Sequence, residues 1–241
     1  MILVDTLLYK IDQRLNKLST NGHQQIPLED KILALNEAQI KLIKQKITGT
    51  VTNTQLGLDS FKKRYEELQN LIIGFKKQEL KETDKLINQW SFALNILKPV
   101  YLFYVDSYIM ANKGRCKDKK IWINKDLSKH GDISLLLKND NYKPSFEYEE
   151  TFNMINNNQF HIYTDGTFEI KELQFMYLKK PAYINKEGYI MIDGESSSNV
   201  NCELDDVLED ELLDLTIQNL AMYTENNTAL QNTNYRIQTN E

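Results

Sequence analysis

The sequence predicts an α+β fold, in which an N-terminal antiparallel helical bundle is completed by a C-terminal helix and carries an inserted β-rich domain. Two observations predict it. Apolar residues recur every three or four positions near both ends of the chain, which is the period of an amphipathic helix. Between them, aromatic and β-branched residues gather in short runs separated by turn residues, as they do in strands. We expect four regions: a helical bundle (1–95), a β-rich insertion (96–200), a C-terminal helix that packs back on the bundle (201–224) and an extended tail (225–241).

The N-terminal region has the spacing of three antiparallel helices. The first carries a stripe of Leu3, Leu7, Ile11, Leu15 and Leu18. The second starts after Pro27 and stops at Gly49, and its stripe is Ile32, Leu35, Gln39, Ile43 and Ile47. The third is capped by Asp59 or Ser60 and buries Phe61, Tyr65, Leu68, Ile72 and Phe75. A shorter fourth helix is expected from about Thr83 to Ala93.

The β-rich region begins after Pro99 with the run "VYLFYVDSYIMA". Further strands are expected over 119–124, 146–155, 159–164, 168–178 and 189–193, with a short helix or turn within 126–137. Turn signals separate them, such as "NNN" at 156–158 and Asp165-Gly166. The C-terminal helix carries two adjacent apolar stripes, so we expect two neighbours to cover it: Leu204, Leu208, Leu212 and Leu215 in one, and Leu213, Ile217 and Leu220 in the other.

Composition restricts the function classes. A net charge of -5 argues against a dedicated nucleic-acid binder, because phosphate contacts need a basic surface. Two cysteines, Cys116 and Cys202, are too few for a disulfide framework, so we expect both to be reduced. The start "MILVDTLLYK" lacks the pattern of a signal peptide, and no apolar run reaches the length of a membrane span. We expect a soluble protein synthesised in a cytoplasm.

No catalytic, cofactor-binding or metal-binding residue is predicted, and we expect the protein not to be an enzyme. The chain contains no nucleophile elbow, P-loop or dinucleotide-binding glycine motif. A zinc site would have to gather four residues that lie far apart in the sequence: Cys116, His130, His161 and Cys202. Together with His23, these residues are better explained as three ordinary histidines and two packed thiols.

Two segments are strongly charged. A basic segment contains Lys113, Arg115, Lys117, Lys119, Lys120, Lys125 and Lys129. An acidic segment contains Glu203, Asp205, Asp206, Glu209, Asp210, Glu211 and Asp214. Each can be an ordinary solvated surface. Alternatively, the two are unlike surfaces that dock head-to-tail between identical subunits, which is the kind of contact that closes into rings.

Several motifs together resemble those of the head-to-tail connector proteins of short-tailed bacteriophages, also called tail adaptor or ring proteins, with the greatest likeness to those of crAss-like phages. They are "LNEAQIKLIKQKI" at 35–47, "NKGRCKDKKI" at 112–121, "KPSFEYEET" at 143–151, "YLKKP" at 177–181 and "CELDDVLEDELLDL" at 202–215. They keep their order over most of the chain. The sequence departs from the family pattern at "LKPVYLF" and at "DDVLEDELL".

The resemblance implies a virion protein that forms a dodecameric ring beneath the portal protein. Its partners would be copies of itself, the portal protein and an adjacent tail ring or tail-barrel protein. Genomic DNA would pass through the lumen without specific binding, and acidic residues facing the lumen would repel it. The polar tail from Glu225 onward would lie on a neighbouring subunit. Alternatives are another virion interaction protein, such as a capsid accessory or tail-fibre attachment protein, and a DNA-handling enzyme.

Overall fold

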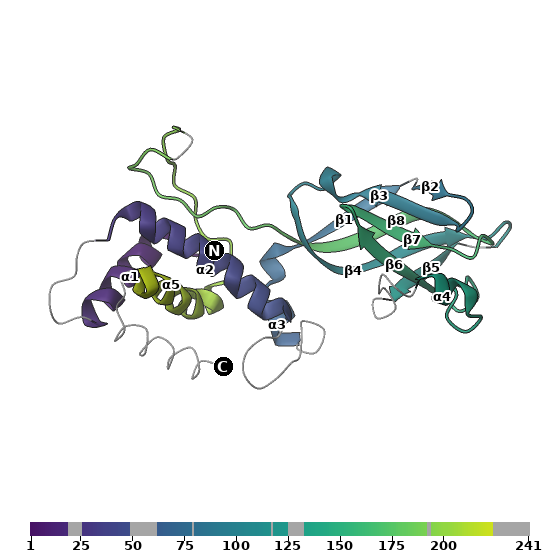
Figure 1. The fold of residues 1–241 in the computed structure, drawn as a ribbon, viewed down its shortest axis with the longest axis horizontal. Helices are drawn as coiled ribbons and strands as arrows, with labels where there is room; N and C mark the ends of the chain where they lie inside the picture. The colour runs from purple at the N-terminus through teal and green to yellow at the C-terminus, as the bar shows by residue number, and fades with distance from the viewer. Residues whose placement is uncertain are drawn as a thin grey trace. The chain divides into compact units, whose positions relative to one another are not determined.

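The computed structural model describes residues 1–18, 26–48, 62–78, 80–116, 118–124, 133–191 and 194–223. The chain divides into two compact units. The helical unit combines Met1–Leu71 with Pro181–Glu241, and the sheet unit is Ile72–Lys180. The sheet unit is therefore inserted between two segments of the helical unit, as the colours of Figure 1 show.

Among its described residues, the helical unit contains three longer helices: α1 (Val4–Leu18), α2 (Leu28–Thr48) and α5 (Glu209–Tyr223). Shorter elements are α3 (Lys62–Glu67) and the 3-10 turns η2 (Gln69–Leu71) and η4 (Asp206–Leu208). Helix α5 contacts both α1 and α2, and its buried residues cover most of its circumference. The core of the unit contains Leu7, Ile11, Ile32, Leu35, Ile43, Leu212, Leu213 and Leu220.

The sheet unit is one curled eight-stranded sheet with the strand order β1-β8-β4-β5-β6-β7-β3-β2 (Figure 1). The strands are β1 (Ile72–Gln78), β2 (Lys81–Asp84), β3 (Gln89–Ala93), β4 (Tyr101–Asn112), β5 (Lys119–Asn124), β6 (Glu150–Asn156), β7 (Gln159–Tyr163) and β8 (Glu169–Lys179). All neighbours pair antiparallel except β5 and β6. The remaining elements are the 3-10 turn η3 (Leu94–Ile96) and the helix α4 (Ile133–Lys138).

An aromatic core fills the concave side of the curled sheet. Phe175 on β8 lies at its centre, with ring centroids 4.8 Å from Phe160 and 5.3 Å from Phe92. Phe75 on the edge strand β1 stacks on Phe92 of β3 at 6.1 Å, although five strands lie between β1 and β3 in the strand order. The sheet is therefore curled far enough for its first strand to share a core with β3 near its other edge.

The sheet's turns follow the predicted turn residues. Asn157 and Asn158 connect β6 to β7 with positive φ angles of 48° and 59°, as a tight hairpin turn requires. Gly166 has a φ of +76°, and a Cβ there would lie 2.9 Å from the side chain of Asn88. The turn signals "NNN" and Asp165-Gly166 are therefore confirmed.

The predicted fold class is wrong, because the described residues form a mixed α/β protein that an eight-stranded curled sheet dominates, with helices at its N- and C-terminal ends instead of a helical bundle. The helix expected from Thr83 to Ala93 is instead the hairpin of β2 and β3. The third helix stops at Glu67, and Ile72 and Phe75 belong to β1. Their i, i+3 spacing fits a helix face, but β1 pairs with β8 and both residues are partly buried in the sheet, so this tertiary contact outweighs local preference.

Other expectations differ at the boundaries or lie outside the described residues. The strand expected over 146–155 is β6, which starts at Glu150. Of the strand expected over 189–193, the described residues 189–191 form one isolated bridge, between Ile190 and Ser196. The caps Asp59 and Ser60, residues 126–132 of the predicted helix or turn, and the tail from 225 to 241 lie outside the described residues.

Replacing Phe175 with alanine should destabilise the protein by about 3–5 kcal/mol, because the residue is fully buried and its removal leaves a cavity among several rings. Urea unfolding followed by circular dichroism measures this change in the free energy of unfolding. The control is Leu86→Ala, since Leu86 is 94% exposed and should change stability by less than about 0.5 kcal/mol. Equal effects of the two substitutions would contradict the central position of Phe175.

Candidate interaction surfaces

The residues considered for a zinc site do not form one in the described structure. His23 and His130 lie outside the described residues. His161 is buried on β7, where its Nδ1 lies 2.6 Å from the side-chain nitrogen of Gln89. Cys116 is exposed in the sheet unit, and Cys202 is buried in the helical unit. Within the part of the chain that is described, no group of three or more potential ligands is close enough to hold a metal ion.

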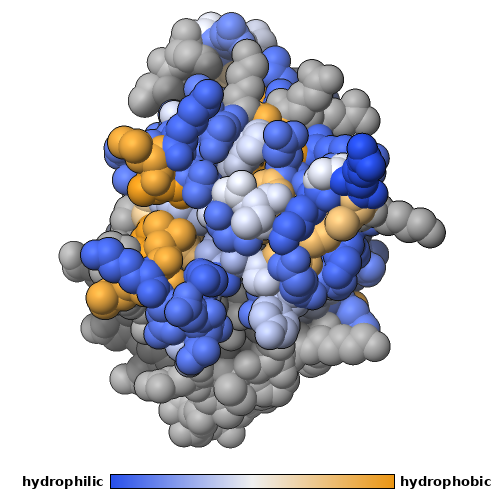
Figure 2. Space-filling model, turned by 90° about the vertical axis from the view of Figure 1, so that its right-hand side faces the viewer, coloured by the Kyte–Doolittle hydropathy of each residue, from blue (hydrophilic) through white to orange (hydrophobic). Residues whose placement is uncertain are grey.

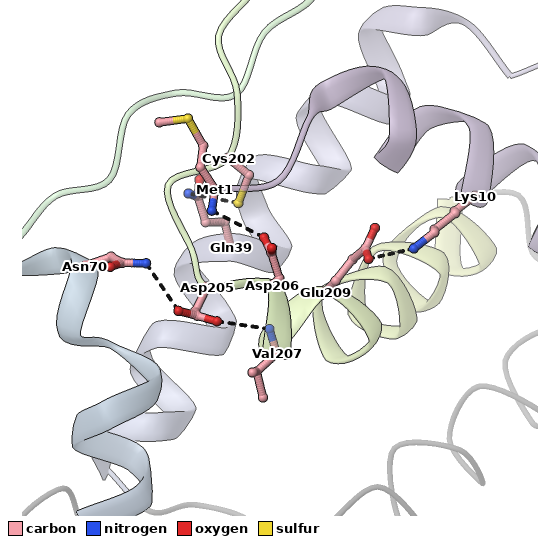
Figure 3. A network of polar contacts seen from close by, with 9 residues as sticks. All are labelled: Met1, Lys10, Gln39, Asn70, Cys202, Asp205, Asp206, Val207 and Glu209. Carbon is pink, nitrogen blue, oxygen red and sulfur yellow. Dashed lines mark hydrogen bonds and ion pairs between the residues drawn. The ribbon is translucent and has the colours of Figure 1, made fainter.

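The acidic segment begins with side chains that hold the start of α5 in place (Figure 3). Asp205 caps the turn η4 by accepting a hydrogen bond from the backbone N–H of Val207 at 3.2 Å. Asp206 lies 3.3 Å from the terminal amino group of Met1. Backbone hydrogen bonds of 3.0 Å in both directions between Ile2 and Cys202 bring that terminus alongside the segment. Glu203 accepts a hydrogen bond from the backbone N–H of Ala182 at 2.9 Å.

The remaining acidic residues pair with basic residues of α1 and α2. Glu209 lies 2.6 Å from Lys10, and Glu211 lies 2.8 Å from Lys46. Arg14 forms ion pairs with both Asp210 and Asp214, and the Asp214 contact measures 2.6 Å. The side chain of Asp214 is only 1% exposed, so its charge requires this partner.

Every carboxylate of the acidic segment thus has a partner within its own unit. Three basic residues, Lys10, Arg14 and Lys46, contact four of the seven acidic side chains, and the terminal amino group of Met1 contacts a fifth. The hypothesis that the segment docks on the basic segment of a neighbouring copy stays a prediction. The hypothesis that acidic residues of this segment face a lumen stays a prediction. The pattern of charges along the sequence identified the segment, but only the packing of α1 and α2 against α5 shows which cations neutralise it.

The basic segment is only partly compensated. Lys117, Lys125 and Lys129 lie outside the described residues. Lys113 lies 2.7 Å from Glu147, and this hydrogen bond raises the pKa of Lys113. Lys119 lies 3.2 Å from Glu149. Among the described residues, no carboxylate pairs with either Arg115 or Lys120.

Lys120 belongs to a cluster that we call the aromatic face: Tyr108 and Met110 on β4, and Lys120 and Trp122 on β5. Tyr108 pairs with Trp122 and Met110 with Lys120 across the two strands, so all four side chains lie on one side of the sheet. The Lys120 Nζ lies 3.8 Å from the Tyr108 ring centroid and 4.0 Å from that of Trp122. The intervening residues Ile109 and Ile121 point to the other side, into the core.

The aromatic face has the composition of a protein contact surface. Trp122 is half exposed, and aromatic and methionine side chains are enriched at such surfaces. Polar residues continue the same row of the sheet, since Tyr108 also pairs with Gln174, which pairs with Lys76. Trp122 and Tyr108 are fourteen positions apart in the sequence, and only the register of β4 and β5 places them together. Figure 2 looks onto the sheet unit and shows hydrophobic residues gathered in groups among hydrophilic ones.

A second exposed feature is the arm, which we define as residues 181–191 and 194–200. In Figure 1 it is the green segment that follows β8, folds back on itself and leads to α5. Asn36 of α2 anchors its base by hydrogen bonds to the backbone N–H and carbonyl of Ile184, of 2.8 and 2.9 Å. The bridge between Asn185 and Val200 joins its two sides.

The outer half of the arm exposes apolar side chains. Tyr189 and Ser197 hold the two sides together by two hydrogen bonds of 3.1 Å. Beyond the base, Ile190 is 73% exposed, and Tyr183, directly before the base residue Ile184, is 52% exposed. The side chain of Glu187 is also exposed and has no cationic partner in the described residues. The sequence predicts a strand over 189–193, and no motif in it identifies the arm as an exposed surface.

Comparisons with known proteins assign no family to this chain. No protein-family model matches it, and none of the curated proteins matches it either. None of the described helices combines the length and apolar character that crossing a lipid bilayer demands.

Replacing Arg14 with methionine should destabilise the protein by about 3 kcal/mol, because it removes the guanidinium from the buried carboxylate of Asp214. Urea unfolding at pH 7 measures this effect. The matched control is Asp210→Ala, which removes the 74% exposed partner of the same arginine and should cost less than about 1 kcal/mol. The reverse order of the two effects would show that the buried pair does not hold α1 on α5.

At pH 8 the folded protein should react with a thiol reagent at Cys116 only, because Cys116 is exposed and Cys202 is buried. Burial raises the pKa of Cys202 to about 11, so its reactive thiolate is scarce at this pH. Counting labelled thiols by mass spectrometry should give one before unfolding and two afterwards. Because the folded pKa is the higher one, Cys202 should also reduce stability as the pH rises from about 9 to 11. Rapid labelling of Cys202 in the folded protein would contradict this assignment.

Proposed function

We propose that this chain is a structural subunit of a phage virion. It forms a dodecameric ring in the portal-proximal head-tail connector or tail barrel, through which DNA is retained and ejected. Its partners are other copies of itself, the portal protein and an adjacent tail ring, and DNA passes through the lumen without being specifically bound.

The proposal rests first on the five ordered motifs that resemble connector proteins, which extend from Leu35 to Leu215. The observation that carries it in the structure is that two different exposed apolar surfaces, the aromatic face and the arm, occur on two different units of one chain. A ring subunit needs two unlike contact surfaces, because each copy meets its two neighbours through different sides. The chemistry of both surfaces suits protein contacts.

The purified chain, mixed with the portal protein of the same phage, should form rings that stack coaxially on the portal. Electron microscopy of the mixture and mass photometry of the chain alone measure the ring and its copy number. A chain that stays monomeric even with the portal protein supplied would contradict the proposal. A copy number that forms no closed ring on the portal axis would favour a capsid accessory or tail-fibre attachment protein.

A further inference from the structure

We propose that the arm of one copy of this chain docks on the aromatic face of the next copy. This inference rests on the proposed self-assembly and identifies the two surfaces that meet. Ile190 and Tyr183 of the arm would pack against Trp122 and Tyr108, and Glu187 would approach Lys120.

The apolar residues of the two surfaces are both exposed in the single chain. Ile190 is 73% exposed at the outer part of the arm, and Trp122 is 50% exposed on the sheet. Each is a large side chain whose burial would remove apolar area from water. The arm is narrow, since single bridges join its two sides, whereas the aromatic face lies on regularly paired strands. Two copies of the chain can therefore place the arm of one on the sheet of the other without refolding.

The charges of the two surfaces are complementary. Glu187 on the arm is exposed and lacks a described cationic partner, while Lys186 beside it is already paired with Asp5 at 2.7 Å. Lys120 on the aromatic face contacts two aromatic rings but no described carboxylate. An arm placed on the face would therefore bring an uncompensated anion towards an uncompensated cation.

The same charges disfavour symmetric contacts. A dimer that joined two aromatic faces would bring two copies of Lys120 together, and one that joined two arms would do the same with Glu187. Like charges placed opposite each other oppose such pairings. The arm-to-face contact is heterologous, so every copy keeps one free arm and one free face until a ring closes.

Charge reversal tests this contact in the full-length chain. Lys120→Glu makes the face negative, and Glu187→Lys makes the arm positive, so each variant alone repels its own copies. We expect each to reduce the ring association constant at least tenfold at 0.15 M salt. In an equal mixture, each arm meets a face of opposite charge, so rings should form again with alternating subunits. The double variant Lys120→Glu, Glu187→Lys should form rings by itself.

Two controls accompany the charge reversals. Lys98→Glu reverses an exposed charge elsewhere on the sheet unit and should leave ring formation unchanged. Ile190→Asp should prevent ring formation in the wild-type chain. It should also do so when both charge-reversal variants carry it and are mixed, because reversing charges does not restore the lost apolar contact. Circular dichroism confirms that each variant is folded. Mass photometry and native mass spectrometry count the subunits and identify their alternation.

The outcomes separate this inference from the proposed function. Rings that form equally well from the wild-type chain and from both single variants would overturn the arm-to-face contact and leave the ring function intact. The same conclusion follows if folded single variants lose their rings and neither the mixture nor the double variant regains them. A wild-type chain that forms no ring, alone or with the portal protein, would overturn the proposed function and this contact with it.

Discussion

The pairing of β1 with β8 is the contact on which the rest of the structure depends. It sets Ile72 opposite Leu178, so the chain enters and leaves the sheet unit on adjacent strands. The segments before and after the sheet can then combine into one helical unit, although α2 and α5 are far apart in the sequence. The same pairing places Phe75 and Phe175 side by side in the register, where both join the aromatic core.

Ion pairs between its own helices hold the helical unit together. Basic residues of α1 and α2 lie against the acidic first half of α5, so ion pairs surround a buried apolar interior. Acidic residues in the first turn of α5 also suit the positive end of a helix dipole. The acidic run, prominent in the sequence, therefore stabilises the unit. Its partners belong to the same unit of the same chain.

The surfaces left for partners are less conspicuous in the sequence than the charged runs. The aromatic face needs the register of β4 and β5, which places Tyr108 opposite Trp122 and Met110 opposite Lys120. The arm needs the anchors from Asn36 and the pairing of Asn185 with Val200. Both surfaces expose apolar side chains beside a charge that has no partner of opposite sign among the described residues.

The sequence by itself determined the local features: the apolar stripes of α1, α2 and α5, the strands β4, β5, β7 and β8, and the turns at Asn157 and Gly166. These depend on short-range periodicity and on backbone conformations that few residues adopt. Only the tertiary structure decided that residues 72–93 form strands, that one curled sheet dominates, and which residues neutralise the acidic segment. Those outcomes depend on pairing between distant segments, such as β1 with β8 and α5 with α1. Such pairing can outweigh the local secondary structure that the spacing of apolar residues favours.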